Sequence, residues 1–133
     1  MYEYQWKCMW GHVDPAGIAY YPRLVIAMHQ AGEDFMDSIG VPYWDLPAEY
    51  GVHFPIVAMN MEFTKPVMVG DTITISVEPE LGTKSLAMDF VATHEDGSVA
   101  YEGHEQHVCV LDEEHRSVEI PDEIRGPLED ALE

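Results

Sequence analysis

Hydrophobic positions in the first third of the chain follow a helical period. Polar residues from Arg23 to Asp37 fill the positions between them. Pro22 suits a first helical turn, where its missing N–H has no partner to lose, and Gly40 is a favourable C-terminal stop. The apolar residues recur at spacings of three and four, which places them on one helical face; they are Leu24, Met28, Ala31, Phe35 and Ile39. The pattern predicts one helix of about 18 residues, or about 27 Å.

The remaining apolar positions change to a period of two, which is typical of strands. An aromatic-rich first strand is expected at residues 2–10, and residues 40–55 read as an irregular connection with three prolines. Alternating segments then begin near Met59, Ile73 and Leu86, the Asp-Gly pair in 95–98 indicates a hairpin, and a long final strand covers 99–111.

The acidic tail from Asp112 onward is expected to hold a short strand or turn. One long helix against an antiparallel sheet is an α+β arrangement, and the length suggests a single domain over residues 1–133. A single helix does not cover both faces of such a sheet, so we also expect self-association through the sheet.

Composition narrows the class of protein. The 47% apolar and 11% aromatic residues argue against disorder. No run approaches the roughly 18 apolar residues of a membrane span, and no leader precedes the first strand, so we expect a cytoplasmic protein with no membrane partner.

The charge is strongly negative, with 25 acidic against 6 basic residues and a net charge of −19. The acids are spread along the chain, and such a surface repels nucleic acid. At molar salt the Debye length falls to about 3 Å, which screens the self-repulsion. We interpret the composition as halophilic adaptation to a salty cytoplasm; an ordinary acidic protein is the alternative.

Cysteine and histidine positions favour structural roles over a metal or disulfide. Cys8 and Cys109 lie in expected strands and are interpreted as buried free thiols. His29 and Glu33 share a helical flank, but two ligands do not make a zinc site. His104 and His107 are three apart in a strand and therefore face opposite sides. We expect no metal.

The segment "HVDPAGIAYYPR", residues 12–23, carries the candidate chemistry. Asp14 has an ordinary interpretation as a turn aspartate, yet it precedes the helix by about seven residues and is too far away to be its N-cap. Gly17 allows backbone to approach a ligand closely. The helix start at Tyr21–Arg23 offers free N–H groups and a positive dipole end. An acid facing a helix N-terminus suits acyl transfer, because the N–H polarises a carbonyl while the carboxylate attacks it or activates water.

These residues resemble a known family. "VDPAGIAYYPR", the apolar-striped helix and "GVPYW", followed by "FPIVAMNMEFTKPVMVGDTITISVE" and "GTKSLAMDF", are similar to the 4-hydroxybenzoyl-CoA thioesterases of the hotdog fold, from about residue 4 to residue 122. The resemblance implies an antiparallel sheet of five to six strands wrapped around one long helix. It also implies a homodimer formed edge to edge, often a dimer of dimers, and an acyl-CoA substrate with no separate cofactor.

The same resemblance assigns roles to residues. Asp14 takes the position of the catalytic carboxylate, Tyr21 supplies the backbone N–H that holds the thioester oxygen, and Gly17 lies in the matching loop. Trp44 would line the acyl pocket, with Phe54 and Pro55 nearby and His29 at the helix position that faces the acyl ring. Lys84 and Ser85 would contact the nucleotide end of coenzyme A.

Two positions depart from the family pattern. His29 stands where benzoyl-type members carry an acid that faces the acyl ring. This difference leaves open whether the acyl group is 4-hydroxybenzoyl. The region that would bind the coenzyme A phosphates contains fewer cations than is usual in the family, and Lys65, Lys84 and Arg23 are the obvious donors. Without the resemblance, Lys84 would be interpreted as an isolated surface cation. The leading hypothesis is an acyl-CoA thioesterase. The alternatives are a hotdog enoyl-CoA hydratase or dehydratase using His12, and a non-catalytic acyl-CoA binding protein.

Overall fold

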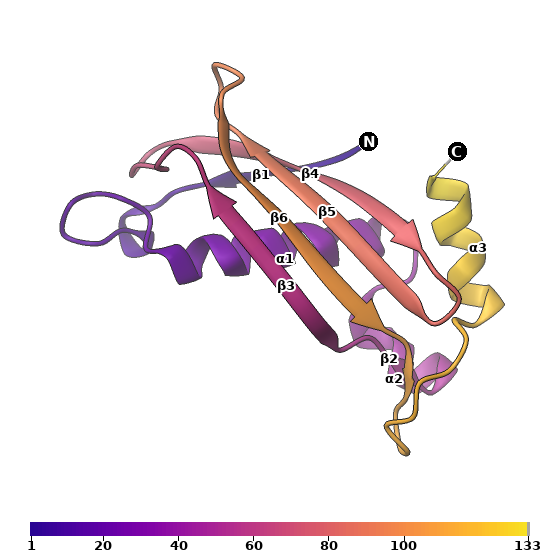
Figure 1. The fold of residues 1–133 in the computed structure, drawn as a ribbon. Coiled ribbons are helices and arrows are strands. Elements are labelled where there is room, and N and C mark those ends of the chain that lie inside the picture. Colours follow the sequence, from indigo (N-terminus) through magenta and orange to yellow (C-terminus); the bar gives the residue numbers. More distant parts are fainter. Residues whose placement is uncertain (133) are drawn as a thin grey trace.

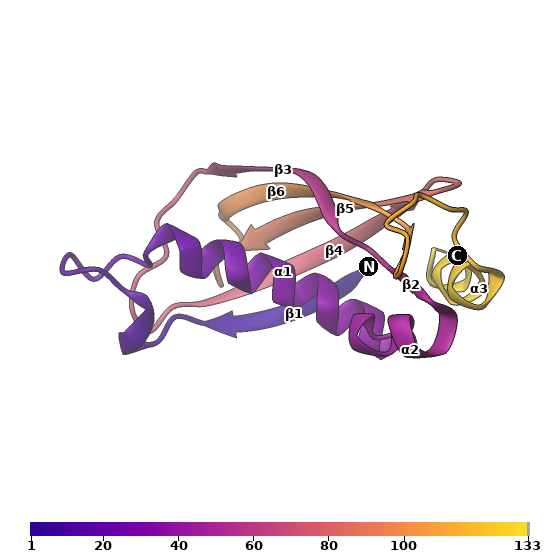
Figure 2. The same ribbon diagram turned by 90° about the horizontal axis from the view of Figure 1, so that it is seen from below.

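A five-stranded antiparallel sheet curves around one long helix in the computed structural model, which describes residues 1–132 (Figures 1 and 2). The strand order is β1-β4-β5-β6-β3. The strands are β1 (Tyr2–Lys7), β3 (Ile56–Phe63), β4 (Thr72–Leu81), β5 (Ser85–Thr93) and β6 (Val99–Val108). Helix α1 (Tyr21–Ser38) has the predicted 18 residues, with Pro22 in its first turn. The expected α+β architecture is confirmed.

Smaller elements gather around the C-terminal end of α1 (Figure 2). The connection over 40–55 is more regular than its prolines indicate, and the expected strand at 2–10 ends at Lys7. These elements are η2 (Tyr43–Asp45), α2 (Leu46–Tyr50), the paired short strands β2 (Val52–His53) and β7 (Val110–Leu111), and α3 (Asp122–Ala131). The short helix η1 (Trp10–His12) lies at the other end, next to the start of α1.

The C-terminal part departs from the expectations in two places. The expected strand 99–111 is interrupted at Cys109, whose N–H donates to the carbonyl of Lys84 at 2.7 Å just before β5 begins; the chain then turns to pair with β2. The tail holds the expected turn, at residues 112–114, and in addition helix α3, which packs onto the fold because Ile124 and Leu128, one turn apart, are both fully buried. Arg125 secures this helix by donating to the carbonyls of Gly82 and Thr83.

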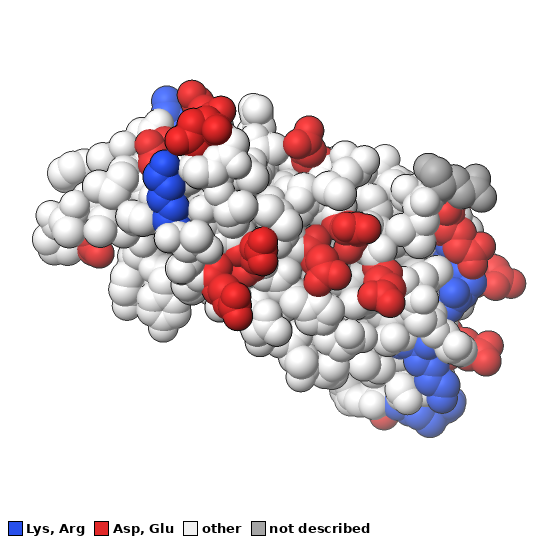
Figure 3. All heavy atoms as spheres, turned by 45° about the horizontal axis from the view of Figure 1, so that its top comes forward, with Lys and Arg blue, Asp and Glu red and all other residues white. Residues whose placement is uncertain are grey.

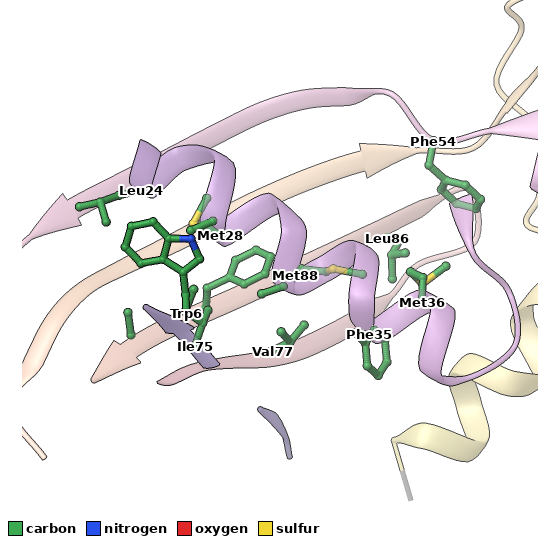
Figure 4. Close-up of a cluster of buried hydrophobic side chains, with 14 of the residues drawn as sticks. Trp6, Leu24, Met28, Phe35, Met36, Phe54, Ile75, Val77, Leu86 and Met88 are labelled. Atoms are coloured by element: carbon green, nitrogen blue, oxygen red, sulfur yellow. The ribbon is translucent and has the colours of Figure 1, made fainter. Parts of the chain in front are cut away.

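The core lies between α1 and the inward face of the sheet (Figure 4). The predicted helical stripe is buried through Phe35, and alternate residues of β4 and β5 such as Ile75 and Met88 face it. A side chain at Gly103 of β6 would overlap the Met28 sulfur, so this glycine allows α1 to approach the sheet. Cys8 and Cys109 are buried free thiols, as expected.

The outward face of the sheet is polar and acidic. Strand register places Glu62 opposite Glu102 and Glu78 opposite Asp89. Like charges directly opposed across strands are destabilising when unscreened. Figure 3 shows acidic groups spread over the face seen there, with the few basic ones toward its ends. No helix in the described part of the chain combines the length and apolar character needed to cross a membrane.

Strand β3 is an unprotected edge. Within residues 1–132 it pairs only with β6, and nearly all of its side chains are exposed. Ile56, Val57, Met59 and Phe63 are 39% to 60% exposed. A long apolar edge strand with unpaired backbone groups is a template for pairing with another strand.

Candidate functional site

Asp14 lies in a tight hairpin between η1 and α1. Val13 and Ala19 form a bridge, and the Tyr20 N–H donates to the His12 carbonyl at 2.9 Å. The Asp14 Oδ1 atom accepts the N–H groups of Ala16 at 2.9 Å and Ile18 at 3.3 Å. The ordinary turn role is therefore present, but it uses one oxygen. Within residues 1–132 the Oδ2 atom has no hydrogen-bond donor, so the turn fixes the carboxylate and leaves one oxygen for chemistry.

Gly17 sits in the left-handed region at φ +79°, where a side chain would be strained. Its carbonyl accepts the N–H of Val69 at 3.0 Å, and the Ala19 N–H donates to Val67 at 2.8 Å. The hairpin is thus bound to the segment that follows β3. It projects beyond the N-terminal end of α1, away from the sheet (Figure 2).

The N-terminus of α1 is uncapped. Tyr20 at the N-cap is extended and makes no side-chain capping bond, Pro22 lacks an N–H, and the first turn contains no acid. The Tyr21 N–H has no acceptor in the described part of the chain. A free N–H at the positive end of a helix binds a carbonyl or an oxyanion.

The hairpin register relates these two groups. Asp14 lies two rungs beyond the pair His12–Tyr20, and Tyr21 directly follows that pair. Asp14 and Tyr21 are therefore three residues apart along the hairpin, which corresponds to about 10 Å of strand.

An apolar pocket of about 260 Å³ adjoins the Tyr21 position. It lies between the first turn of α1 and the segment where β3 ends. Its lining residues are Ile18, Ala19, Tyr21, Leu24, Phe63, Thr64, Lys65 and Pro66. The Lys65 ammonium at its edge is engaged by Asp96 at 3.3 Å and Ser98 at 3.1 Å.

The predicted acyl-pocket residues form a second group. His29, Phe54 and Pro55 line a pocket of about 240 Å³ together with Glu33, Tyr43 and His53. Trp44 lies outside this pocket and is 63% exposed, whereas its neighbour Tyr43 lines it. Sequence reasoning missed Tyr43 because the irregular connection gives no period from which to assign a direction to each aromatic ring.

Glu105 and His107 of β6 lie beneath this second pocket and were also missed. Each is 1% exposed, and they are the buried polar residues of the described chain. Glu105 contacts the His29 Nδ1 atom at 3.1 Å and the His107 Nε2 atom at 3.2 Å. The period of two along β6 places Glu105 and His107 on one face, which is the signal that was available. His104 faces the other side and bonds Asp89 at 2.7 Å, as its spacing from His107 predicts.

Burial and hydrogen bonding oppose each other at Glu105. Burial raises its pKa, but the bonds from His107 and His29 outweigh burial and lower the pKa to about 2. In turn the hydrogen bond to Glu105 raises the pKa of His29 despite its partial burial. The second group therefore combines an ionised acid with a readily protonated imidazole.

Within one chain the two groups lie toward opposite ends of β3. The Asp14 hairpin contacts the segment after Phe63, whereas Ile56, at the other end, pairs with His107. Ser85 starts β5 opposite Val108, so Lys84 and Ser85 belong to the end that carries His107. Asp14 and Gly17 share the hairpin that leads into the helix start at Tyr21, whereas Lys84 and Ser85 lie toward the other end of the sheet.

Comparison of the sequence with known proteins identifies the family. The model of the thioesterase-like superfamily matches residues 8–128. The chain belongs to this superfamily. It is 27% identical over 132 residues to a 1,4-dihydroxy-2-naphthoyl-CoA hydrolase of Thermosynechococcus vestitus, covering 98% of this chain and 90% of that protein.

Solved structures agree. A gentisyl-coenzyme A thioesterase, BH1999, is 28% identical with a TM-score of 0.82, covering 95% of this chain and 98% of that one. A 1,4-dihydroxy-2-naphthoyl-CoA thioesterase from Synechocystis has a TM-score of 0.90 over 97% and 96% of the two chains, and at 18% identity it supports the fold alone. The expected hotdog fold and the thioester hydrolase class are confirmed for this superfamily member, and the specific 4-hydroxybenzoyl-CoA branch stays a prediction.

Proposed function

We propose that this chain hydrolyses the coenzyme A thioester of an aryl acyl group, with Asp14 as the catalytic carboxylate. The observation that carries the proposal is the Asp14 hairpin, which binds one carboxylate oxygen, leaves the other free and leads directly into an uncapped helix N-terminus. The hydroxylated aryl groups named for the related hydrolase and for the gentisyl-CoA thioesterase support an aryl substrate. A short or medium acyl chain is the alternative substrate.

The proposed reaction places the thioester between the two groups. The Tyr21 N–H and the positive end of α1 polarise the carbonyl oxygen. Asp14 either takes a proton from the attacking water or attacks the carbonyl carbon itself to give an anhydride that water then opens. In both routes the C–S bond breaks, coenzyme A leaves as the thiol after taking up a proton, and water supplies the oxygen of the carboxylic acid. The reaction needs no separate cofactor.

We further propose that two chains pair antiparallel through β3. A two-fold axis near the middle of the strand, between Met59 and Asn60, sets the Phe63 end of each strand beside the beginning of the other. The exposed apolar side chains of β3 support this pairing. It brings the Lys84 end of one chain toward the Asp14 hairpin of the other, which the predicted site requires.

The nucleotide end of coenzyme A is assigned to Lys84 and Ser85 of the partner chain. Lys84 is exposed and has no ion pair within residues 1–132, which leaves its charge available for a phosphate. We propose further that Trp44 contributes to the acyl pocket, that dimers associate in pairs, and that the protein works in a salt-rich cytoplasm.

The hydratase alternative would use His12. Its Nδ1 atom accepts the Met9 N–H at 2.9 Å, and its ring packs on Trp6 with centroids 4.7 Å apart. This gives His12 a local role in shaping the hairpin, and the free Asp14 oxygen favours hydrolysis.

A thiol-release screen tests the proposal. Aryl, short-chain and long-chain acyl-CoAs are incubated with the protein in molar potassium chloride, and an enoyl-CoA is followed for both thiol release and hydration. We expect thiol release, fastest with an aryl substrate, and no hydration. Hydration without thiol release would support the hydratase, and binding without turnover of any thioester would support the non-catalytic alternative.

A further inference from the structure

Apart from its two chain ends, the backbone of the Asp14 hairpin is attached to the fold through the segment 64–71, which joins β3 to β4. Within residues 1–132, the backbone hydrogen bonds that leave the hairpin go to Val67 at 2.8 Å and to Val69 at 3.0 Å. Met68, between these two residues, forms a bridge with the hairpin. The position of the hairpin therefore depends on how this segment is held.

The Asp71 carboxylate closes a turn at the end of the segment. The Met68 N–H donates to the Asp71 Oδ2 atom at 2.8 Å, and the Asp71 N–H donates to the Met68 carbonyl at 3.0 Å. Gly70, the third residue of the turn, has φ +89°, as a type II turn requires. Met68 is thus fixed by two bonds with Asp71, and it is also the residue that bridges to the hairpin.

Backbone bonds hold the two ends of the segment independently of this carboxylate. At one end the Lys65 N–H donates to the Ala100 carbonyl at 3.1 Å. At the other end the Cys8 N–H donates to the Asp71 carbonyl at 2.8 Å, and the Gly70 N–H donates to the Cys8 carbonyl at 2.7 Å. Because these bonds involve no side chain, a substitution of Asp71 can keep them and change only the turn between them.

Packing does not hold the turn in place of the carboxylate. Val67 is buried, but Met68 and Val69 are 39% and 43% exposed. A cavity of about 520 Å³ lies beside them, lined in part by Asp71 and His94. The His94 Nδ1 atom is 3.9 Å from the Asp71 Oδ2 atom, which is too far for a hydrogen bond. The position of the turn therefore depends on the bond from the Met68 N–H.

Ile18 connects the turn to the Asp14 carboxylate. Ile18 forms the bridge with Met68, and its N–H donates to the Asp14 Oδ1 atom at 3.3 Å. The Ile18 carbonyl also accepts the Asp14 N–H at 2.9 Å. A displacement of Met68 therefore moves Ile18 and Asp14 together. The Tyr21 N–H keeps its place, because α1 packs on the sheet through its own buried face.

We propose that Asp71 is a positioning residue for the hydrolysis: its carboxylate holds a turn that keeps Asp14 in place relative to the N-terminus of α1. The inference rests on the proposed role of Asp14 in thioester hydrolysis. Asp71 lies outside the apolar pocket that adjoins Tyr21, so it acts through the hairpin and not on the substrate.

The kinetic test compares Asp71→Ala with Asp71→Asn on the acyl-CoA that the wild type hydrolyses fastest. In Asp71→Ala we expect kcat to fall by about 10- to 100-fold with KM unchanged, since a misplacement of about 1 Å can reduce the rate by a factor of that size. Asp71→Asn keeps an oxygen that accepts the Met68 N–H, so it should restore most of the turnover. Asp89→Ala is the matched control and should keep the wild-type kcat, because this exposed aspartate bonds His104 on the outward face of the sheet.

Amide hydrogen exchange separates positioning from a general loss of stability. In Asp71→Ala, peptides that cover residues 13–20 and 64–71 should exchange faster than in the wild type. Peptides from β5 and β6 should keep their protection, because the turn does not belong to the central strands. Asp71→Asn should return both affected peptides to the wild-type exchange rate.

The inference and the proposed function fail in different ways. A wild-type kcat in Asp71→Ala, or a fall in kcat with faster exchange in every peptide, overturns the positioning role and leaves the role of Asp14 standing. A fall in kcat that Asp71→Asn does not restore also overturns it. If the wild type hydrolyses no thioester, or if Asp14→Asn keeps full turnover, the proposed function is wrong and the inference is wrong with it.

Discussion

Replacing Glu105 by glutamine is expected to reduce the amount by which the free energy of unfolding falls as the pH is lowered. Glutamine keeps the shape and accepting oxygen of the side chain but removes its charge. The folded-state pKa of Glu105 is lowered to about 2 from an ordinary 4.5. The carboxylate therefore contributes stability that is fully present above the unfolded pKa and is lost as the pH falls through the folded one.

The magnitude follows from the two pKa values. At about 1.4 kcal/mol per pKa unit the charge contributes about 3 kcal/mol near neutral pH. Between pH 5 and pH 3 about 2 kcal/mol of this is lost, because the unfolded chain takes up the proton first. His29 does not contribute to the change between pH 5 and pH 3, because its raised pKa keeps the imidazole charged throughout this range.

Urea denaturation followed by tryptophan fluorescence measures this effect, in molar potassium chloride so that the surface carboxylates are screened. The free-energy difference between wild type and Glu105→Gln should shrink by about 2 kcal/mol from pH 5 to pH 3. Glu102→Gln, on the same strand but facing solvent, is the matched control and should keep the wild-type slope. A difference between wild type and Glu105→Gln that is the same at both pH values would refute the assigned ionisation of Glu105.

Three further outcomes are expected. Raising potassium chloride from 0.1 M to molar concentrations should increase the urea midpoint, since a net charge of −19 and opposed pairs such as Glu62–Glu102 repel when unscreened; a falling midpoint would count against salt adaptation. Gly103→Ala should lower the free energy of unfolding by about 1 to 3 kcal/mol, because the new methyl group overlaps the Met28 sulfur, and an unchanged denaturation curve would contradict this packing. Val57→Lys should lower the mass measured by light scattering and reduce thiol release, because it places a charge on the exposed edge of β3; an unchanged mass would argue against edge pairing.

Local patterns were enough to predict the main architecture. The period of the apolar residues, Pro22 and Gly40 located α1 almost to the residue, and alternation located the central strands. Helix α3 was missed because its apolar content is small: only Ile124 and Leu128 are buried, and Pro127 between them argues against a helix. Its position is set by packing onto the end of the sheet, which no local pattern contains.

The candidate site was predictable where it is built from neighbouring residues. Asp14, Gly17 and Tyr21 belong to one hairpin and one helix start, so their spacing carries the geometry. The contact between His29 and Glu105 joins residues 76 positions apart, and it depends on how α1 crosses β6. Contacts between distant segments of this kind require the assembled fold.

The most direct test of the account is the turnover of Asp14→Asn. Asparagine keeps a side-chain oxygen for the N–H groups of Ala16 and Ile18, so the hairpin should stay intact while the free carboxylate oxygen is lost. We expect kcat for the best acyl-CoA to fall by at least about 100-fold with an unchanged unfolding midpoint. Asp96→Asn, a turn aspartate that accepts the Ser98 N–H at 2.9 Å, should keep wild-type turnover. Near-wild-type kcat in Asp14→Asn would contradict the central claim that this carboxylate carries out the hydrolysis.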